Sequence, residues 1–138
     1  MKQDYKKAIE WFTKAAEQGH SYAQSGLGHL YLMGWGVPKD YKQAFEWSSK
    51  AATDKSNPFG PLQLGLLYHD GKGVERDYKM AYAWYTIAAA NGNAFAKKEK
   101  ANISVKMTVD QTVKALELSK ELLKKMVKKN PKLIQKKD

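Results

Sequence analysis

The sequence predicts an all-α protein built from repeated pairs of helices, because one pattern returns along most of its 138 residues. The segment DYKKAIEWFTKAAEQG at 4–19 is repeated with substitutions at 40–55 and at 77–92. Between these copies, SYAQSGLGHLYLMGWGVPK at 21–39 is matched by PFGPLQLGLLYHDGKGVER at 58–76. In both kinds of segment apolar residues recur at three- and four-residue steps, the period of a helix packed on one side. The chain is therefore expected to stack its helices as a repeat array.

The first kind of segment, called here the Asp-Tyr helix, has clear start and stop signals. Asp40 and Asp77 stand where a helix needs the side chain of an N-cap residue. Glycine at 19 and at 92 stands where a helix commonly ends. A tryptophan follows each aspartate in phase with the alanine stripe, so all three tryptophans are predicted to pack between helices: Trp11, Trp47 and Trp84.

The second kind of segment, called here the Leu-Gly helix, carries the pairs Leu27-Gly28 and Leu64-Gly65. Its predicted inward stripe is Ala23, Leu27, Leu30 and Tyr31, with the matching residues in the next copy. Glycine inside a helix costs about 1 kcal/mol relative to alanine. We therefore expect the backbone of a neighbouring helix to approach these glycines closely. The Gly-x-Gly-Val stretches at 34–37 and 71–74 then supply turns, since they follow helices and lack the Lys-Ser/Thr ending of a phosphate-binding loop.

The repeat pattern changes after Ala96, where the expected leucine-glycine pair is replaced by Lys100-Ala101. Thr108 and Gln111 have the spacing of a capping box, which predicts a final helix running to about residue 130. Its buried face is predicted to consist of Val109, Val113, Leu116 and Leu123, with lysines on a polar outer face. Such a helix would close the array, as terminal helices of solenoids do.

The alternating pattern resembles Sel1-like repeats, which are relatives of the tetratricopeptide repeat. The residues that carry the resemblance are A-x-x-x-L-G-x-x-Y-x-x-G-x-G-V followed by D-Y-x-x-A-x-x-W-x-x-x-A-A. The resemblance implies a short right-handed α/α superhelix of Sel1-like helix pairs with a C-terminal capping helix, usually a non-catalytic, often bacterial scaffold for protein–protein contacts. The expected parts are an array over 1–107 with copies near 4–39, 40–76 and 77–107, a capping helix at 108–130 and a lysine-rich tail at 131–138.

A partner-binding face follows from helical geometry and from this resemblance, which places the Leu-Gly helices on the concave surface. Turning the inward stripe of each Leu-Gly helix towards the core leaves a second set of residues on the opposite side. Trp35, which lies between two turn glycines, is either a contact residue or packed locally. The candidate partner-binding residues are Tyr22, Ser25, His29, Leu32, Trp35, Phe59, Leu62, Leu66 and His69. The alternative is that this set packs on further repeats or on a second copy of the chain.

The charge of +10 suggests a second class of function. Residues 1–96 carry 11 basic and 9 acidic side chains, a net charge of +2, whereas residues 97–138 carry 13 and 5, a net charge of +8. Nearly all of the basic residues are lysines, and Arg76 is the single arginine. Specific recognition of phosphates and bases relies strongly on arginine. An adaptor for nucleic acid or another anionic surface, acting through the C-terminal helix, is therefore the alternative to a protein-binding scaffold.

Other classes of function find little support in the residues. The chain has no cysteine, its histidines lack the spacing of a helical metal pair, and no pair of a nucleophile and a base is suggested, so we expect no enzyme activity, cofactor or metal. The N-terminus has no apolar signal core, which predicts a cytoplasmic protein, or a periplasmic or secreted one if a precursor was trimmed. An immunity or accessory protein for a bacterial effector is one form of the scaffold. A homodimer through the exposed N-terminal helix is another expectation, because Ile9 and Phe12 are predicted to flank an apolar patch.

Overall fold

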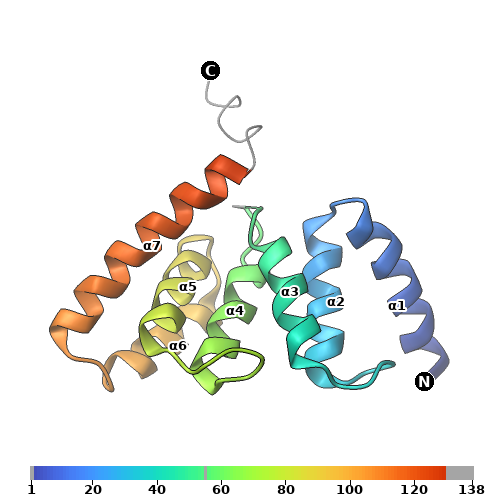
Figure 1. Cartoon of the computed structure of the whole chain (residues 1–138), viewed down its shortest axis with the longest axis horizontal. Helices are drawn as coiled ribbons and strands as arrows, with labels where there is room; N and C mark the ends of the chain where they lie inside the picture. Colours follow the sequence, from blue (N-terminus) through green and yellow to red (C-terminus); the bar gives the residue numbers. More distant parts are fainter. Residues whose placement is uncertain (1, 55, 130–138) are drawn as a thin grey trace.

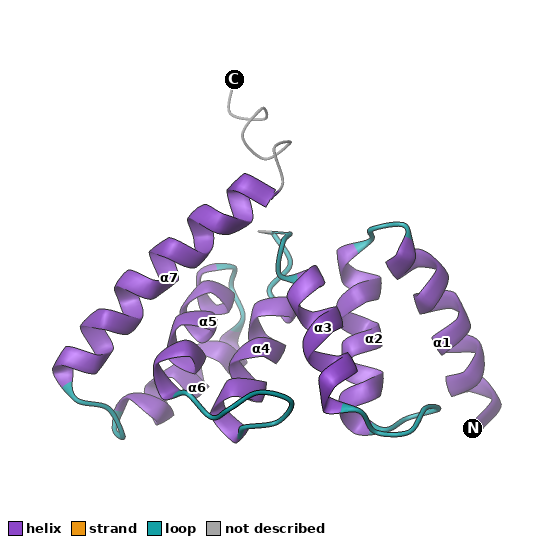
Figure 2. Cartoon of the chain, in the orientation of Figure 1, coloured by secondary structure: helices purple, strands orange, loops and turns teal. Residues whose placement is uncertain are grey.

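The computed structural model describes residues 2–54 and 56–129, and within them the chain is all-helical, as predicted (Figure 1). Turns and short loops join the helices (Figure 2). The lysine-rich tail predicted at 131–138 lies outside the described residues. The helices are α1 (Lys2–Glu17), α2 (Ser21–Met33), α3 (Tyr41–Ala51), α4 (Phe59–Asp70), α5 (Tyr78–Ala90), α6 (Ala94–Ser104) and α7 (Val109–Lys129).

The helices stack in chain order, with α1 at one end of the molecule and α7 at the other (Figure 1). From α1 to α6 each helix packs against the next one in the chain, and α2 also contacts α4. α1, α3 and α5 are the Asp-Tyr helices, whereas α2, α4 and α6 occupy the Leu-Gly positions. α7 departs from this order, because it packs mainly against α5. The solenoid architecture expected from the repeats is therefore confirmed.

The predicted N-caps of the Asp-Tyr helices are confirmed. Asp40 accepts hydrogen bonds from the backbone N–H groups of Lys42 and Gln43, both at 3.1 Å. Asp77 does the same at the start of α5, at 3.0 and 3.2 Å. Each carboxylate thereby satisfies two N–H groups that have no partner within the helix. At the far end of the chain, the predicted capping box between Thr108 and Gln111 is also formed.

We expect Asp77→Ala to lower the free energy of unfolding by about 1 kcal/mol, because both capping hydrogen bonds are lost. Urea unfolding followed by circular dichroism measures this change. Asp4→Ala is the matched control, since Asp4 lies inside the first turn of α1 and not at the N-cap position. An equal loss in both variants would show that charge, and not capping, is responsible.

The glycines predicted to end helices adopt positive φ angles, as such turns require. Gly34 and Gly71 end α2 and α4 with φ angles of +71° and +68°, in the left-handed region that glycine enters without strain. Gly19 and Gly92 follow α1 and α5 with φ of +91° and +90°. Glycine thus sets the reversals after α1, α2, α4 and α5, whereas the turn between α3 and α4 contains no glycine with positive φ.

The glycines inside the helices permit close packing, but side chains come nearest to both glycines for which a neighbouring backbone was predicted. A Cβ atom on Gly28 would lie 3.0 Å from side-chain oxygens of Gln63 and Ser48, and 3.3 Å from the backbone carbonyl of Ala44. A Cβ atom on Gly65 would lie 2.5 Å from the ring of Tyr85, so a side chain fills the space at this point and not a helix backbone. At Gly60 the neighbouring backbone does approach, because a Cβ atom there would lie 2.6 Å from the nitrogen of Ala52. The contacts at Gly60 and Gly65 hold α4 tightly against its neighbours in the array.

The recurring tryptophans confirm the packing prediction in two copies out of three. Trp84 is buried with Ala52 and Leu64, and Trp47 packs on a cluster that contains the equivalent residues of the preceding pair of helices, Ala16 and Leu27. Trp11 contradicts the prediction, since it is 73% exposed. The physical reason is that each tryptophan covers the helix pair before it, and the structure describes no such pair in front of α1.

The prediction for the buried face of α7 was correct for Leu123, which is half-buried against the cluster around Trp84, and wrong for its other three residues. Val109, Val113 and Leu116 are exposed, and the helix is buried through Ala115, Ser119 and Met126. Ala115 joins the core around Tyr85, and Met126 joins the one around Trp84. Small side chains at two of the three positions let α7 approach α5 closely, which branched valines would prevent. A terminal helix was expected to have a polar outer face, but the outer face of α7 also carries exposed apolar residues.

Candidate partner-binding surface

The exposed side of α2, α4 and α6 is called here the Leu-Gly face. The predicted partner-binding residues come from α2 and α4, except Trp35 in the loop after α2, and their exposure differs widely. Tyr22 and Phe59 are the most prominent, with 56% and 45% of their surface exposed. His29 and Trp35 are also exposed. The half-buried members are Leu32, Leu62, Leu66 and His69, and Ser25 is buried.

Two aromatic residues from consecutive repeats meet on this face. Tyr22, in the first turn of α2, and Phe59, at the start of α4, form an edge-to-face pair with ring centroids 6.1 Å apart. Phe95 holds the equivalent place at the start of α6 and is 49% exposed. Each Leu-Gly position of the array thus presents one exposed aromatic side chain. We call these three residues, Tyr22, Phe59 and Phe95, the aromatic row.

Phe95 was missed in the sequence because the third copy loses its leucine-glycine pair a few residues later. The signal was nevertheless present. Phe95 follows Gly92 at the same distance as Tyr22 follows Gly19, and a buried alanine comes directly after each aromatic residue. The start of the repeat therefore persists in α6 although its centre has changed.

Leu62 and Leu66 serve the core as well as the surface. Both pack against the cluster around Tyr85 and are only partly accessible. Leu66 also shares a hollow of about 280 Å³ with Leu32, Lys39 and Tyr41, so the structure brings together two of the predicted residues at this end of α2 and α4. A charged substitution at Leu62 or Leu66 would disturb the fold together with the surface.

Ser25 does not lie on the exposed face where the helical projection placed it. Only 3% of its surface is accessible, and its hydroxyl donates a hydrogen bond to the carbonyl of Tyr22 at 3.0 Å. The side chain of Gln63 on α4 donates to the Ser25 carbonyl at 2.8 Å. α4 crosses α2 at this point and covers the serine, a contact between helices that the projection of one helix cannot show. Ser25 is therefore removed from the candidate surface.

Trp35 packs on its own repeat. Its ring stacks on Tyr5 of α1 at 5.7 Å and meets His29 edge-on at 5.4 Å. Later copies keep this arrangement with a lysine in place of the tryptophan. The ammonium group of Lys72 lies 5.4 Å from the ring of Tyr41, and that of Lys106 lies 5.8 Å from Tyr78. In each copy a residue of the turn region thus lies against the tyrosine of an Asp-Tyr helix. This recurrence favours local packing, and not partner contact, for Trp35.

His69 is similarly engaged with its neighbours. Its Nδ1 atom lies 3.1 Å from the hydroxyl of Tyr85, and its ring meets that of Tyr78 edge-on at 5.8 Å. Burial raises the pKa of Tyr85 far above its usual range, with a smaller contribution from Glu99 and Asp70. The tyrosine is therefore a neutral hydrogen-bonding group at physiological pH. His69 anchors α4 on α5 and offers only part of its ring to a partner.

A hollow lies at the N-terminal end of the array and includes Tyr22 of the aromatic row. It has a volume of about 570 Å³ and lies between the end of α1 and the start of α2. Phe12, which was predicted to flank an exposed apolar patch, lines it and is half-buried, whereas Ile9 does not line it. Trp11 and Tyr22 contribute the exposed aromatic surface. The hollow and the aromatic row thus share Tyr22.

The described part of the chain shows no arrangement that points to metal chemistry, because no three of its histidine and carboxylate side chains are grouped to hold a metal ion. Among the same residues, none of the helices combines the length and the apolar content needed to cross a bilayer.

The stacked helix pairs, the glycine turns and the repeated aromatic positions define an α/α-solenoid protein whose surface is suited to macromolecular contacts. Residues 1–20, 21–56 and 62–93 match the Sel1 repeat. The chain belongs to the Sel1 repeat family, whose members are typically non-catalytic adaptors. No curated protein matches the chain.

Two solved structures place the fold among known bacterial proteins. A protective antigen present in uropathogenic Escherichia coli strains, which displays the SLR fold, is 39% identical to the chain, with a TM-score of 0.86. The match covers 99% of this chain and 29% of the antigen. A Sel1 repeat protein from Oxalobacter formigenes is 35% identical, with a TM-score of 0.62, over 69% of this chain and 39% of its own length. The chain therefore spans well under half the length of either protein.

Proposed function

We propose that this chain is a non-catalytic scaffold that binds a protein or peptide partner on the Leu-Gly face, the surface expected to be concave. The observation that carries the proposal is the aromatic row, one exposed aromatic side chain at the start of each Leu-Gly position. Large aromatic side chains are enriched at the centres of protein interfaces, because each removes much apolar surface from water with few rotatable bonds. Membership of a family of adaptors supports the same function.

In this proposal the residues of the Leu-Gly face have different roles. Tyr22 and Phe59 already contact one another, so they form one platform that loses little side-chain entropy when a partner binds. Leu62 and Leu66 are half-buried and add apolar surface that is held in place by their contacts with the core. His29 is exposed next to Trp35 and can donate or accept a hydrogen bond. Binding is therefore expected to be mainly apolar and to persist at high salt.

The triple variant Tyr22→Ser, Phe59→Ser and Phe95→Ser is expected to lose a partner that the native chain retains from source-cell extract at about 0.15 M salt. The three side chains are exposed, so the fold should remain intact by circular dichroism. Trp11→Ser is the matched control, because it removes an exposed aromatic residue outside the row. Equal recovery by all three proteins would refute binding through the aromatic row.

Identification of the captured protein also tests narrower forms of the proposal. A bacterial effector would indicate that the chain is an immunity or accessory protein, and cell fractionation tests the cytoplasmic location. Retention of the chain's own copies would indicate a homodimer, which the apolar hollow beside α1 could form.

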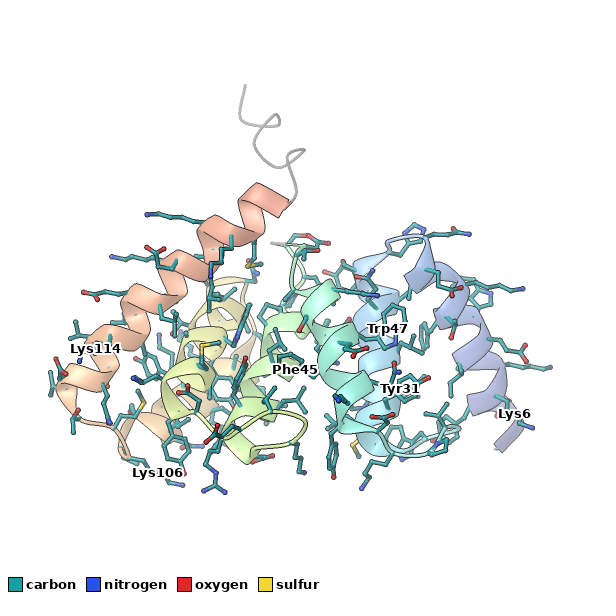
Figure 3. The ribbon with its side chains drawn as sticks, in the orientation of Figure 1. Lys6, Tyr31, Phe45, Trp47, Lys106 and Lys114 are labelled. Carbon is teal, nitrogen blue, oxygen red and sulfur yellow. The ribbon has the colours of Figure 1, made fainter. Side chains whose placement is uncertain are left out.

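An adaptor for nucleic acid or an anionic surface is the second candidate, favoured by the exposed lysines of α7. Lys114 projects from the outer side of this helix (Figure 3). Affinity that depends on lysines must fall steeply as salt is raised, because counterions are released when phosphates are neutralised. Binding that persists from about 0.05 to 0.5 M salt and depends on the aromatic row excludes this candidate.

A further inference from the structure

The helix α7 has a second apolar stripe that nothing in the described structure covers. Val109, Val113 and Leu116 follow one another at four- and three-residue steps, the spacing of a helix–helix seam. Val109 is 82% exposed and Leu116 is 38% exposed. The helix is already held on α5 through Ala115, Ser119 and Met126, so this stripe is not needed to attach it.

The register of the repeats shows what this stripe corresponds to. Ala44 on α3, Ala81 on α5 and Ala115 on α7 are all buried almost completely. A buried serine follows four residues later at Ser48 on α3 and at Ser119 on α7. These matches align α7 with the Asp-Tyr helices, although it lacks their aspartate and tryptophan. Leu116 then occupies the place of Phe45 and Tyr82.

On α3 and α5 this place receives the next helix of the array. Phe45 meets Tyr68 of α4 edge-on at 5.7 Å, on the side of α3 that faces α4 (Figure 3). Tyr82 is 7% exposed and belongs to the cluster that contains Ala96 and Ile103 of α6. The stripe that contains Leu116 is thus equivalent to the surfaces through which α3 packs on α4 and α5 packs on α6. The occupant that fits it is an amphipathic helix packed along α7.

At one position of this stripe, a neutral residue of α3 and α5 is replaced by a lysine on α7, and this indicates the charge of the helix that could bind there. Four residues after Phe45 and Tyr82 stand Ser49 and Thr86, whose hydroxyls bond to their own helices at 2.8 Å. The equivalent residue on α7 is the exposed Lys120. A helix covering Leu116 must therefore meet an ammonium group in the middle of the seam, and a carboxylate opposite it would compensate the lost hydration. The acidic residues Asp110, Glu117 and Glu121 also lie on this part of α7, so the preference for a carboxylate rests on Lys120 itself and not on the net charge of +8 over 97–138.

We propose that the outer stripe of α7 binds an acidic amphipathic helix of a partner protein, with a carboxylate facing Lys120. A second copy of this chain is a poor occupant. Its own exposed helical stripe, on α1, is centred on Trp11, and Lys7 and Lys14 lie one turn to either side of it. Lysines would then face lysines across the seam. The surface is separate from the aromatic row and does not depend on it.

A synthetic helix tests this proposal directly. The probe is a fluorescein-labelled peptide of about three heptads, with leucine at the seam positions, glutamate beside them and alanine elsewhere. We expect Leu116→Ser and Lys120→Glu each to weaken its binding at least about tenfold in fluorescence anisotropy. A second peptide, with lysine in place of glutamate, should bind the Lys120→Glu variant more tightly than it binds the native chain. Both substituted residues are exposed, so folding is preserved and can be checked by thermal melting.

Two controls separate the outcomes. A peptide of the same composition with its leucines moved off the seam should not bind, and Tyr22→Ser should bind the probe like the native chain. Equal binding of both peptides, or no effect of Leu116→Ser, would overturn the proposal in favour of general attraction to lysines. Sedimentation that shows a dimer abolished by Leu116→Ser would assign the stripe to a second copy instead. None of these results depends on the partner of the aromatic row.

Discussion

Tyr85→Ala is expected to lower the free energy of unfolding by about 3–5 kcal/mol, the range for truncating a large buried aromatic residue. Tyr85 is 0% exposed and lies at the centre of the cluster that joins α5, α6 and α7. Its ring also fills the space left by Gly65 on α4, so the truncation opens a cavity at the contact of four helices. Residual contacts cannot close such a cavity without moving whole helices.

Urea unfolding, followed by both circular dichroism and tryptophan fluorescence, measures this loss. Tyr22→Ala removes the same atoms from an exposed site and should change the free energy of unfolding by no more than about 0.5 kcal/mol. Tyr85→Phe removes only the hydroxyl that lies 3.1 Å from His69, and should cost about 1 kcal/mol. A loss below about 1 kcal/mol for Tyr85→Ala would show that α5 is not the central element of the array.

The array could be predicted from the sequence because its main determinants are local and repeated. An N-cap such as Asp77 needs only the backbone of its own first turn, and a left-handed glycine such as Gly71 needs only its own φ angle. Repetition then adds evidence, because the same signal appears two or three times in the same order. Family membership and fold class were accordingly both predicted correctly.

The surface was harder to predict because it depends on which helix covers which. A projection of one helix places Ser25 opposite the core, but α4 crosses that side and buries it. The same projection selected the larger apolar stripe of α7, whereas close approach to α5 favoured Ala115 and Ser119. Trp11 has the sequence context of Trp84 but is exposed, because the structure describes no helix pair against which it could pack. In each case the outcome depends on how neighbouring helices pack on the residue, and the periodicity of one helix does not reveal this.

Gly60→Ala is expected to destabilise the protein by about 1–3 kcal/mol, although alanine is the better helix former by roughly 1 kcal/mol. The added Cβ atom would lie 2.6 Å from the nitrogen of Ala52 and 2.8 Å from the carbonyl carbon of Ala51. Both are backbone atoms at the end of α3, which cannot rotate away as a side chain could. Relief therefore requires α4 to move away from α3, with loss of packing along their contact.

Gly26→Ala in α2 is the matched control, since the same substitution there has the opposite expected sign. The nearest atoms to its added Cβ belong to the ring of Phe12 at 3.4–3.5 Å, which is ordinary contact. The gain in helix propensity should therefore appear as an increase of up to about 1 kcal/mol in the free energy of unfolding. Opposite shifts of the urea midpoint in the two variants would show that glycine is kept at position 60 by the approach of a neighbouring backbone. A stabilised Gly60→Ala would mean that the junction of α3 and α4 yields easily, and that the repeats of this solenoid are less rigidly stacked than their contacts indicate.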